Sequence, residues 1–194
     1  MPRISTQEFE RLPLRVHDFL AGVSLHDVWA VDLPRVRSGI TLNEFLNNAS
    51  ARSLRCSPAV QALVNLRVAL GRIFGWDHEP AARSWETFAS RLTAFDRSRT
   101  LAPPGKPEGM FRMVYRFENE QLLELINRTA HAAALSALIE TDGSYRFYFG
   151  VYVSPVSRFT RVYMSLIEPF RRLVVYPSLL RAIQARWIES FCKA

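Results

Sequence analysis

Cysteine is scarce in this chain of 194 residues, which has only Cys56 and Cys192, far apart in the sequence. Two cysteines without a paired spacing argue against a disulfide framework and against a zinc site. We therefore expect no metal and no other cofactor. Few cysteines and no disulfide framework also favour a reducing compartment, so a cytoplasmic location is the expectation.

Long apolar runs are missing too. The first ten residues are polar, so no signal peptide is expected, and no run approaches the roughly 18 apolar residues of a membrane-spanning helix. The length favours one domain over residues 1–194, with a loose segment at 1–12.

Lysine is nearly absent, because 23 of the 25 basic residues are arginine and only Lys106 and Lys193 are lysine. GC-rich codon usage explains this skew more simply than function does. The arginines are spread along the chain and no groove-reading motif is present, so no nucleic-acid partner is expected despite the net charge of +7.

One basic segment stands out near the C-terminus, where only Glu168 and Glu189 oppose seven basic residues. A solvated helix face is the ordinary explanation. Attraction to an anionic ligand or membrane surface is the alternative. The seven basic residues are Arg158, Arg161, Arg171, Arg172, Arg181, Arg186 and Lys193.

Catalytic motifs are also lacking: there is no glycine-rich phosphate loop, no helix-borne metal motif and no nucleophile elbow. No catalytic residue is assigned, and whether the protein is an enzyme stays open. His131 follows Glu124 and Asn127, and a His–Glu pair facing one cavity could perform acid–base chemistry. A hydrogen-bonded structural histidine is the more common case.

The last third of the chain is the most informative part. Residues 145–153 alternate, with Tyr145, Phe147, Phe149, Val151 and Val153 on one face of a predicted strand. After Pro155 an apolar face recurs at the helical period. Its residues are Phe159, Val162, Tyr163, Leu166, Ile167 and Phe170. We expect the strand face and the helix face to pack on each other, with Phe147 and Phe149 against Tyr163 and Leu166.

Prolines divide this final helix in the prediction. Pro169 and Pro177 cannot donate a helical hydrogen bond, so we expect a kinked or two-piece helix over 157–175 and 178–191. Leu180, Ile183 and Trp187 continue the apolar face in the second piece.

The N-terminal half predicts one strand and several helices. Residues 28–33 form a predicted strand, whereas 14–19 could be an edge strand or a loop. Thr41 begins a capping box before a short helix at about 42–49, and Ser57-Pro58 begins a second helix that ends near Gly75. A third helix is plausible at 84–94, and 101–109 is a loop.

From Phe111 the pattern favours an antiparallel meander. Strands are expected at 113–117, 122–126 and 132–139, and Asp142-Gly143 marks a hairpin into the aromatic strand. The segment 132–139 could instead continue the preceding strand through a bulge at 127–130, or be helical. Its alanines at 132, 133, 134 and 137 are small, and opposite a wall of phenylalanines they would leave room for a cavity.

Taken together, the elements predict an α+β fold in which an antiparallel sheet is gripped by a long kinked C-terminal helix, with short helices in the N-terminal half. This arrangement resembles the helix-grip plan of START-like and Bet v 1-like proteins. Residues 110–190 resemble a bacterial family called domain of unknown function 2867, through Asn127-Arg128-Thr129-Ala130-His131, Val153, 161–164 and 167–177. The resemblance implies a fold and no catalytic residues. The helix-grip plan usually has seven strands, whereas five or six are counted here.

The resemblance implies a small apolar or amphipathic ligand held between the sheet and the C-terminal helix. The predicted lining is Phe147, Phe149, Val151, Tyr163, Leu166 and His131. A cyclase- or hydrolase-like enzyme that uses the same cavity is the first alternative. A protein- or membrane-surface interaction through the basic C-terminal helix is the second. The oligomeric state cannot be derived from the sequence.

Overall fold

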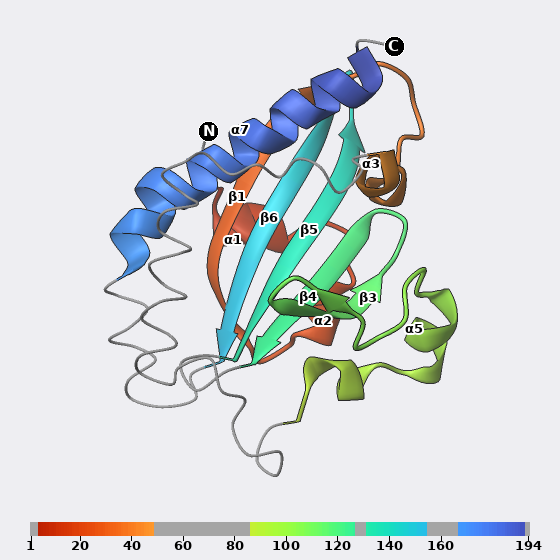
Figure 1. Ribbon diagram of the computed structural model, residues 1–194, viewed down its shortest axis with the longest axis vertical. Helices are drawn as coiled ribbons and strands as arrows, with labels where there is room; N and C mark the ends of the chain where they lie inside the picture. Colours follow the sequence, from red (N-terminus) through yellow and green to blue (C-terminus); the bar gives the residue numbers. More distant parts are fainter. Residues whose placement is uncertain (1–3, 49–85, 127–130, 155–166, 193–194) are drawn as a thin grey trace.

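The computed structural model describes residues 4–48, 86–126, 131–154 and 167–192 (Figure 1). Within these ranges the chain forms an α+β fold, with one antiparallel sheet, short helices in the N-terminal half and a long C-terminal helix. The C-terminal helix crosses one face of the sheet, and the helices α1 and α2 lie behind the other face (Figure 1). None of the described helices is both long and apolar enough to cross a membrane. The single-domain assignment stays a prediction.

The sheet has six strands among the described residues, in the order β1-β6-β5-β4-β3-β2. Every neighbouring pair is antiparallel, so β3 to β6 form the predicted meander and β1 adds beside β6. The short strand β2 adds beside β3, within a segment that was predicted to be a loop. The strand bounds are β1 Ser24–Pro34, β2 Pro107–Glu108, β3 Phe111–Arg116, β4 Glu120–Ile126, β5 His131–Thr141 and β6 Ser144–Ser154. The strand β5 pairs with β4, which excludes both the bulge and the helix alternatives for this segment.

The hairpin between β5 and β6 fixes the register of two of the three longest strands. Thr141 pairs with Ser144 across the predicted Asp142-Gly143 turn. Gly143 has φ +89°, a left-handed conformation that glycine adopts without a steric penalty. Because the side-chain period of a strand is two, this register decides which residues of both strands face the C-terminal helix.

The predicted alternation of β6 is confirmed. Tyr145 and Phe147 are buried beneath the C-terminal helix, whereas Tyr148 and Tyr152 are buried in a second core on the opposite face. The alanines of β5 divide between the same two faces: Ala133 pairs with Tyr152, and Ala134 pairs with Val151. Only half of the alanines therefore face the C-terminal helix.

The expectation of a loose N-terminus is wrong for residues 4–12. Helix α1 spans Thr6–Glu10, and Ser5 caps it by accepting a hydrogen bond from the Glu8 N–H. Phe9 has no exposed surface, because it inserts into the core on the sheet face opposite the C-terminal helix. Ile4 is buried in the same core, and its N–H donates to the Val28 carbonyl, so two apolar side chains dock a segment that otherwise looks polar.

The segment predicted as an edge strand or loop at 14–19 is also different in the structure. It contains helix α2, Val16–Phe19, with Val16 and Phe19 buried. The carboxylate of Glu120 accepts hydrogen bonds from the N–H groups of Arg15 (2.8 Å) and Val16 (2.9 Å). This long-range partner satisfies the first N–H groups of the helix, which the local sequence could not reveal.

Two of the remaining predicted helices can be compared with the structure. Helix α3, Leu42–Asn48, is confirmed, and the Thr41 hydroxyl accepts from the Glu44 N–H as predicted. The helix predicted at 84–94 is wrong, because the chain forms a short 3-10 helix η1, Phe88–Arg91, and a separate helix α5, Ala94–Arg99. A capping box between Thr93 and Asp96 starts the second helix anew. The helix predicted from Ser57 lies outside the described residues.

The described C-terminal helix runs without a break from 167 to 192, so the two-piece alternative is wrong, and the kinked alternative stays a prediction. It includes a π-helical segment η2, Arg171–Val175, then α7, Tyr176–Trp187, and a second π-helical segment η3, Ile188–Cys192. In η2 the Tyr176 N–H donates to the Arg171 carbonyl, five residues back. The wider turn ends next to Pro177, which has no N–H to contribute, so the helix continues past this proline.

Candidate functional site

The antiparallel register aligns residues in rows that cross the sheet beneath the C-terminal helix. One row contains Trp29 on β1, Phe149 on β6, Ser136 on β5, Gln121 on β4 and Arg116 on β3. Directly paired residues of neighbouring strands point to the same face. The row therefore changes from aromatic to small and polar and then to charged across five strands.

The next row lies beside the first on the same face. It contains Asp27, Val151, Ala134, Leu123 and Met113, again from β1 to β3. The middle of both rows is only half-buried, in contrast to Phe147 and Leu138 under α7. We name Phe149, Val151, Ala134, Ser136 and Leu123 the floor, since these five half-buried residues form one patch.

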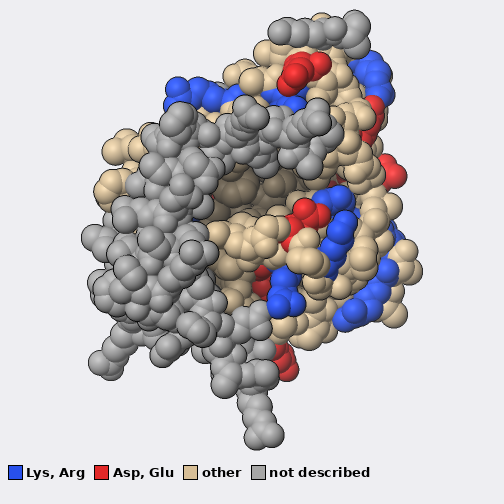
Figure 2. All heavy atoms as spheres, viewed as in Figure 1, with Lys and Arg blue, Asp and Glu red and all other residues tan. Residues whose placement is uncertain are grey.

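Figure 2 shows the molecular surface hollowed over the middle of β5 and β6, below α7. Side-chain size explains part of the depth of this hollow, because the side chains of Ala134 and Ser136 extend little above the sheet. Longer side chains at the same positions would fill the space between the strands and the helix. Two small residues of β5 therefore contribute to the hollow, and the ligand cavity stays a prediction.

A charged cluster borders the floor at the β1 end. The Asp27 side chain has no exposed surface, and its carboxylate lies 3.5 Å from Arg171 Nη2 and 3.6 Å from Arg172 Nη2. Arg172 also pairs with Glu168 one turn earlier in the helix. Both arginines belong to the π-helical segment η2, and π-helical turns are frequent at functional sites.

Tyr176 joins this cluster to the floor. Its ring centroid lies 5.3 Å from that of Trp29 and 5.9 Å from that of Phe149. Its hydroxyl accepts a hydrogen bond from Arg171 Nη2. Burial raises the pKa of Tyr176 to about 12, so the phenol is protonated at neutral pH.

His26 lies at the edge of the same cluster, in a bulge of β1, with Nε2 3.7 Å from an Asp27 oxygen. Burial, together with the nearby Arg171 charge, lowers the pKa of His26. The imidazole is therefore neutral at pH 7, and the cationic groups of the cluster are the two guanidiniums.

Two buried donors of the cluster have no hydrogen-bond acceptor among the residues that the structure describes. They are Nε1 of Trp29, a residue only 8% exposed, and Nε of Arg172. An indole N–H can only donate, and a buried donor without an acceptor is uncommon in a folded protein. The β1 end of the floor thus has two unmatched buried donors, beside the Asp27 carboxylate that both arginines contact.

The structure brings together some of the predicted site residues and separates others. Phe149 and Val151 lie on the floor. Phe147 points to the same face of the sheet but is buried beneath the C-terminal helix. Tyr163 and Leu166 lie outside the described residues. His131 was expected at this cavity, but the structure places it on the opposite face of the sheet. Every second side chain of a strand points to the same face, so His131 points the same way as Ala133, whereas Ala134 points toward the floor.

His131 does pair with Glu124, as its position in the sequence suggested, with Nε2 2.7 Å from Oε1. Both side chains are buried, and the same Glu124 oxygen accepts from the Phe88 N–H. The imidazole also stacks on the Phe88 ring at a centroid distance of 4.0 Å. These contacts fasten η1 to the sheet, which is a structural role for the pair.

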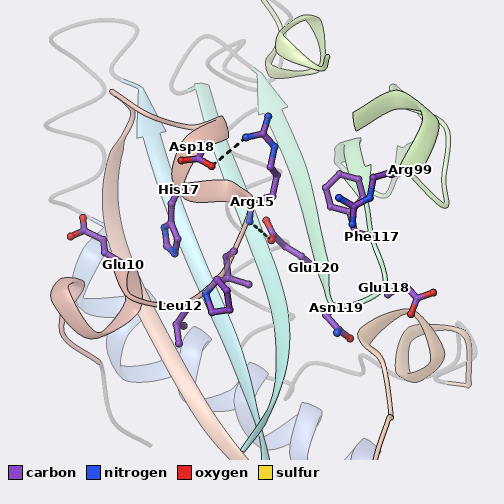
Figure 3. A pocket seen from close by; sticks show the side chains of 12 residues that line it. Glu10, Leu12, Arg15, His17, Asp18, Arg99, Phe117, Glu118, Asn119 and Glu120 are labelled. Atoms are coloured by element: carbon purple, nitrogen blue, oxygen red, sulfur yellow. Dashed lines mark hydrogen bonds and ion pairs between the residues drawn. The ribbon is translucent and has the colours of Figure 1, made fainter. Parts of the chain in front are cut away.

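A second hollow lies on the opposite face, between the α1–α2 connection and the turn that precedes β4 (Figure 3). Its volume is about 630 Å³, and Leu14, Arg15, Phe117 and Glu120 are among its lining residues. A smaller hollow of about 270 Å³ adjoins it and shares Glu10 and His17 with it. We call these two hollows the opposite groove.

The main charged groups of the opposite groove are bound to one another. Glu120 accepts from two backbone N–H groups and from the Tyr115 hydroxyl, and burial raises its pKa. The Arg15 guanidinium donates to Asp96 at 3.0 and 3.1 Å and to Asp18 at 3.5 Å. These contacts hold α2 and α5 in place, which gives Glu120 and Arg15 a structural role.

The sequence analysis missed Asp27, Trp29 and Tyr176 as site residues. It included Arg171 and Arg172 in a basic segment, either as a solvated helix face or as a site of attraction to an anionic ligand or surface. A signal for Asp27 was present, because an aspartate directly before a hydrophobic strand is costly to bury without a partner. Within the described ranges, no three His, Cys, Asp or Glu side chains form a group that could hold a metal ion.

Comparison with known proteins gives a family and nothing beyond it. No curated protein and no solved structure matches the chain. One family model matches residues 19–178, which include the whole sheet, the floor and the cluster around Asp27. The match covers most of the sequence and confirms the family resemblance seen over residues 110–190. The chain therefore belongs to the family described as Protein of unknown function (DUF2867).

Proposed function

We propose that the protein binds one small apolar or amphipathic molecule on the floor, between the C-terminal helix and β3. The observation that carries this proposal is the half-buried patch in the middle of an otherwise well-covered sheet, where Ala134 and Ser136 adjoin Phe149. Ligand sites are concave and mostly apolar with a few polar groups. The floor has this composition.

The dimensions and the ends of the floor favour an elongated, amphipathic molecule. Neighbouring strands are about 4.8 Å apart, so the distance from β1 to β3 across the sheet is roughly 19 Å. At the β1 end are Asp27 and the two arginines of η2. At the β3 end the Arg116 guanidinium donates to Gln121 at 2.6 Å and to Glu108 at 3.2 Å. Polar groups at both ends of an apolar patch suit a molecule with a polar end.

The enzyme alternative has less support, because a reaction requires polar groups that converge on one point of a cavity. The described His–Glu pair lies on the other face of the sheet and is buried. The phenol of Tyr176 stays protonated at neutral pH. The described residues of the floor therefore favour binding over acid–base chemistry.

The surface-interaction alternative depends on basic residues that point outward from the C-terminal helix. Arg171 and Arg172 instead reach Asp27 beneath the helix, and Arg186 lies 3.4 Å from Glu189. Arg181 donates to the Pro177 carbonyl of its own helix. Four described members of the basic set thus have intramolecular partners, which weakens the case for an anionic surface as the main partner.

Titration with a fluorescent fatty-acid or naphthalene-type probe tests the proposal. We expect saturable binding of one probe per chain, and we expect Ala134→Phe to weaken it at least tenfold by filling the floor. Phenylalanine is well tolerated in strands, so the fold should persist, which circular dichroism checks.

The matched control is Ala21→Phe, which adds the same ring to the opposite groove. This variant should bind the probe like the wild type. Loss of binding in Ala21→Phe alone would place the probe in the opposite groove. Absence of binding by any apolar probe, combined with salt-sensitive adhesion to anionic vesicles, would favour the surface-interaction alternative.

A further inference from the structure

The unmatched donors of the charged cluster indicate what the polar end of a ligand would be. A buried N–H without an acceptor is unfavourable, so it is uncommon in folded proteins. Trp29 Nε1 is such a donor, and within the described residues no acceptor reaches it. A ligand that supplies an oxygen acceptor here would remove this cost.

Arg172 provides the second donor and a positive charge. Its Nη2 already pairs with Glu168 and Asp27, while its buried Nε has no acceptor within the described ranges. A guanidinium has five N–H donors, more than these two carboxylates use in the structure. Guanidinium groups match carboxylates in shape as well as in charge.

The two donors belong to one end of the same floor. Trp29 pairs with Phe149 across the strands, and Asp27, which Arg172 contacts, pairs with Val151 in the adjacent row. A cationic ligand would compete with Arg171 and Arg172 for Asp27, whereas an acceptor would complement both unmatched N–H groups. The chemistry of this end therefore selects an acceptor over a donor.

We propose that the ligand carries a carboxylate, which accepts hydrogen bonds from Trp29 and Arg172 while its apolar body lies along the floor toward β3. This inference depends on the proposed function, because it assigns the polar end of a molecule that binds there. It also gives the molecule a direction: head at β1 and tail over β5 and β4.

The test compares dodecanoic acid with dodecan-1-ol as displacers of the fluorescent probe, at a pH where the acid is ionised. Charge-assisted hydrogen bonds favour the acid, and we expect it to bind at least tenfold more tightly than the alcohol. Trp29→Phe removes the N–H but keeps an aromatic ring, and Arg172→Met removes the guanidinium but keeps the aliphatic stem. Each variant should reduce the preference for the acid to less than threefold.

Arg181→Met is the matched control, because it removes one positive charge from an exposed position of the same helix. Its preference for the acid should equal that of the wild type. Equal affinities of acid and alcohol for the wild type would overturn the carboxylate assignment and leave the proposed function standing. If the probe, the acid and the alcohol all fail to bind, the proposed function is wrong and this inference is wrong with it. Circular dichroism of each variant separates loss of preference from loss of fold.

Discussion

Replacing Trp187 with alanine should lower the free energy of unfolding by about 3 to 5 kcal/mol, the usual range for a fully buried tryptophan. Trp187 has no exposed surface. Its ring packs against Tyr145, Phe45 and Phe191, at centroid distances of 5.1, 5.6 and 4.8 Å. Its indole N–H donates to the Pro34 carbonyl at 2.8 Å, so the substitution also leaves an acceptor unpaired.

Urea unfolding followed by circular dichroism measures this loss. Leu173→Ala is the control on the same helix, because Leu173 is 77% exposed and its truncation should change the free energy by less than about 0.5 kcal/mol. Similar small losses for both variants would show that the C-terminal helix does not pack on the sheet as described. The floor would then lack its covering helix, and the proposed binding site would lose its basis.

The second large effect is expected at Glu120. Replacing it with alanine removes the acceptor of the Arg15 and Val16 N–H groups and of the Tyr115 hydroxyl. Each buried donor that is left unpaired costs about 1–3 kcal/mol. Removing Glu120 also removes the cost of burying a carboxylate, which offsets part of this loss. We expect a net loss of about 2 to 4 kcal/mol in the free energy of unfolding.

Two further substitutions make this result interpretable. Glu120→Gln retains one acceptor oxygen and should lose less stability than the alanine variant. Glu118→Ala removes an exposed carboxylate from the same turn and should be nearly neutral. An equal loss in the Glu118 and Glu120 alanine variants would argue against the buried network that joins α2 to the sheet. The affinity of the floor for the fluorescent probe should equal that of the wild type in every one of these variants that stays folded.

The strands and the covering helix could be predicted because local patterns encode them. The alternation of Phe147, Tyr148 and Phe149 marks both faces of β6, and Asp142-Gly143 marks the hairpin. Helices α1 and α2 were not predictable in the same way. Each is shorter than two turns, and its hydrogen-bonding and packing partners lie far along the chain, as Glu120 does for Val16.

The candidate site was predictable only in part, for a physical reason of the same kind. Phe149 and Val151 belong to the face that the alternation identified. Asp27 and Trp29 reach that face only through the pairing of β1 with β6, which joins segments more than 100 residues apart. His131 was placed on the wrong face because a shift of one residue in a strand reverses the side-chain direction. Pro177 was expected to kink or divide the helix, and the helix continues past it after a π-helical turn that local sequence patterns did not indicate.

The most direct test of the account is a crystal structure with a dodecanoic acid that carries bromine at its methyl end, because anomalous scattering locates the bromine. The account predicts a bromine peak over the floor near Leu123 and Ala134, with the carboxylate beside Trp29. A bromine peak in the opposite groove, between Leu14 and Phe117, would contradict the assignment of the site. A crystal with no bound acid under saturating conditions would contradict the binding function itself.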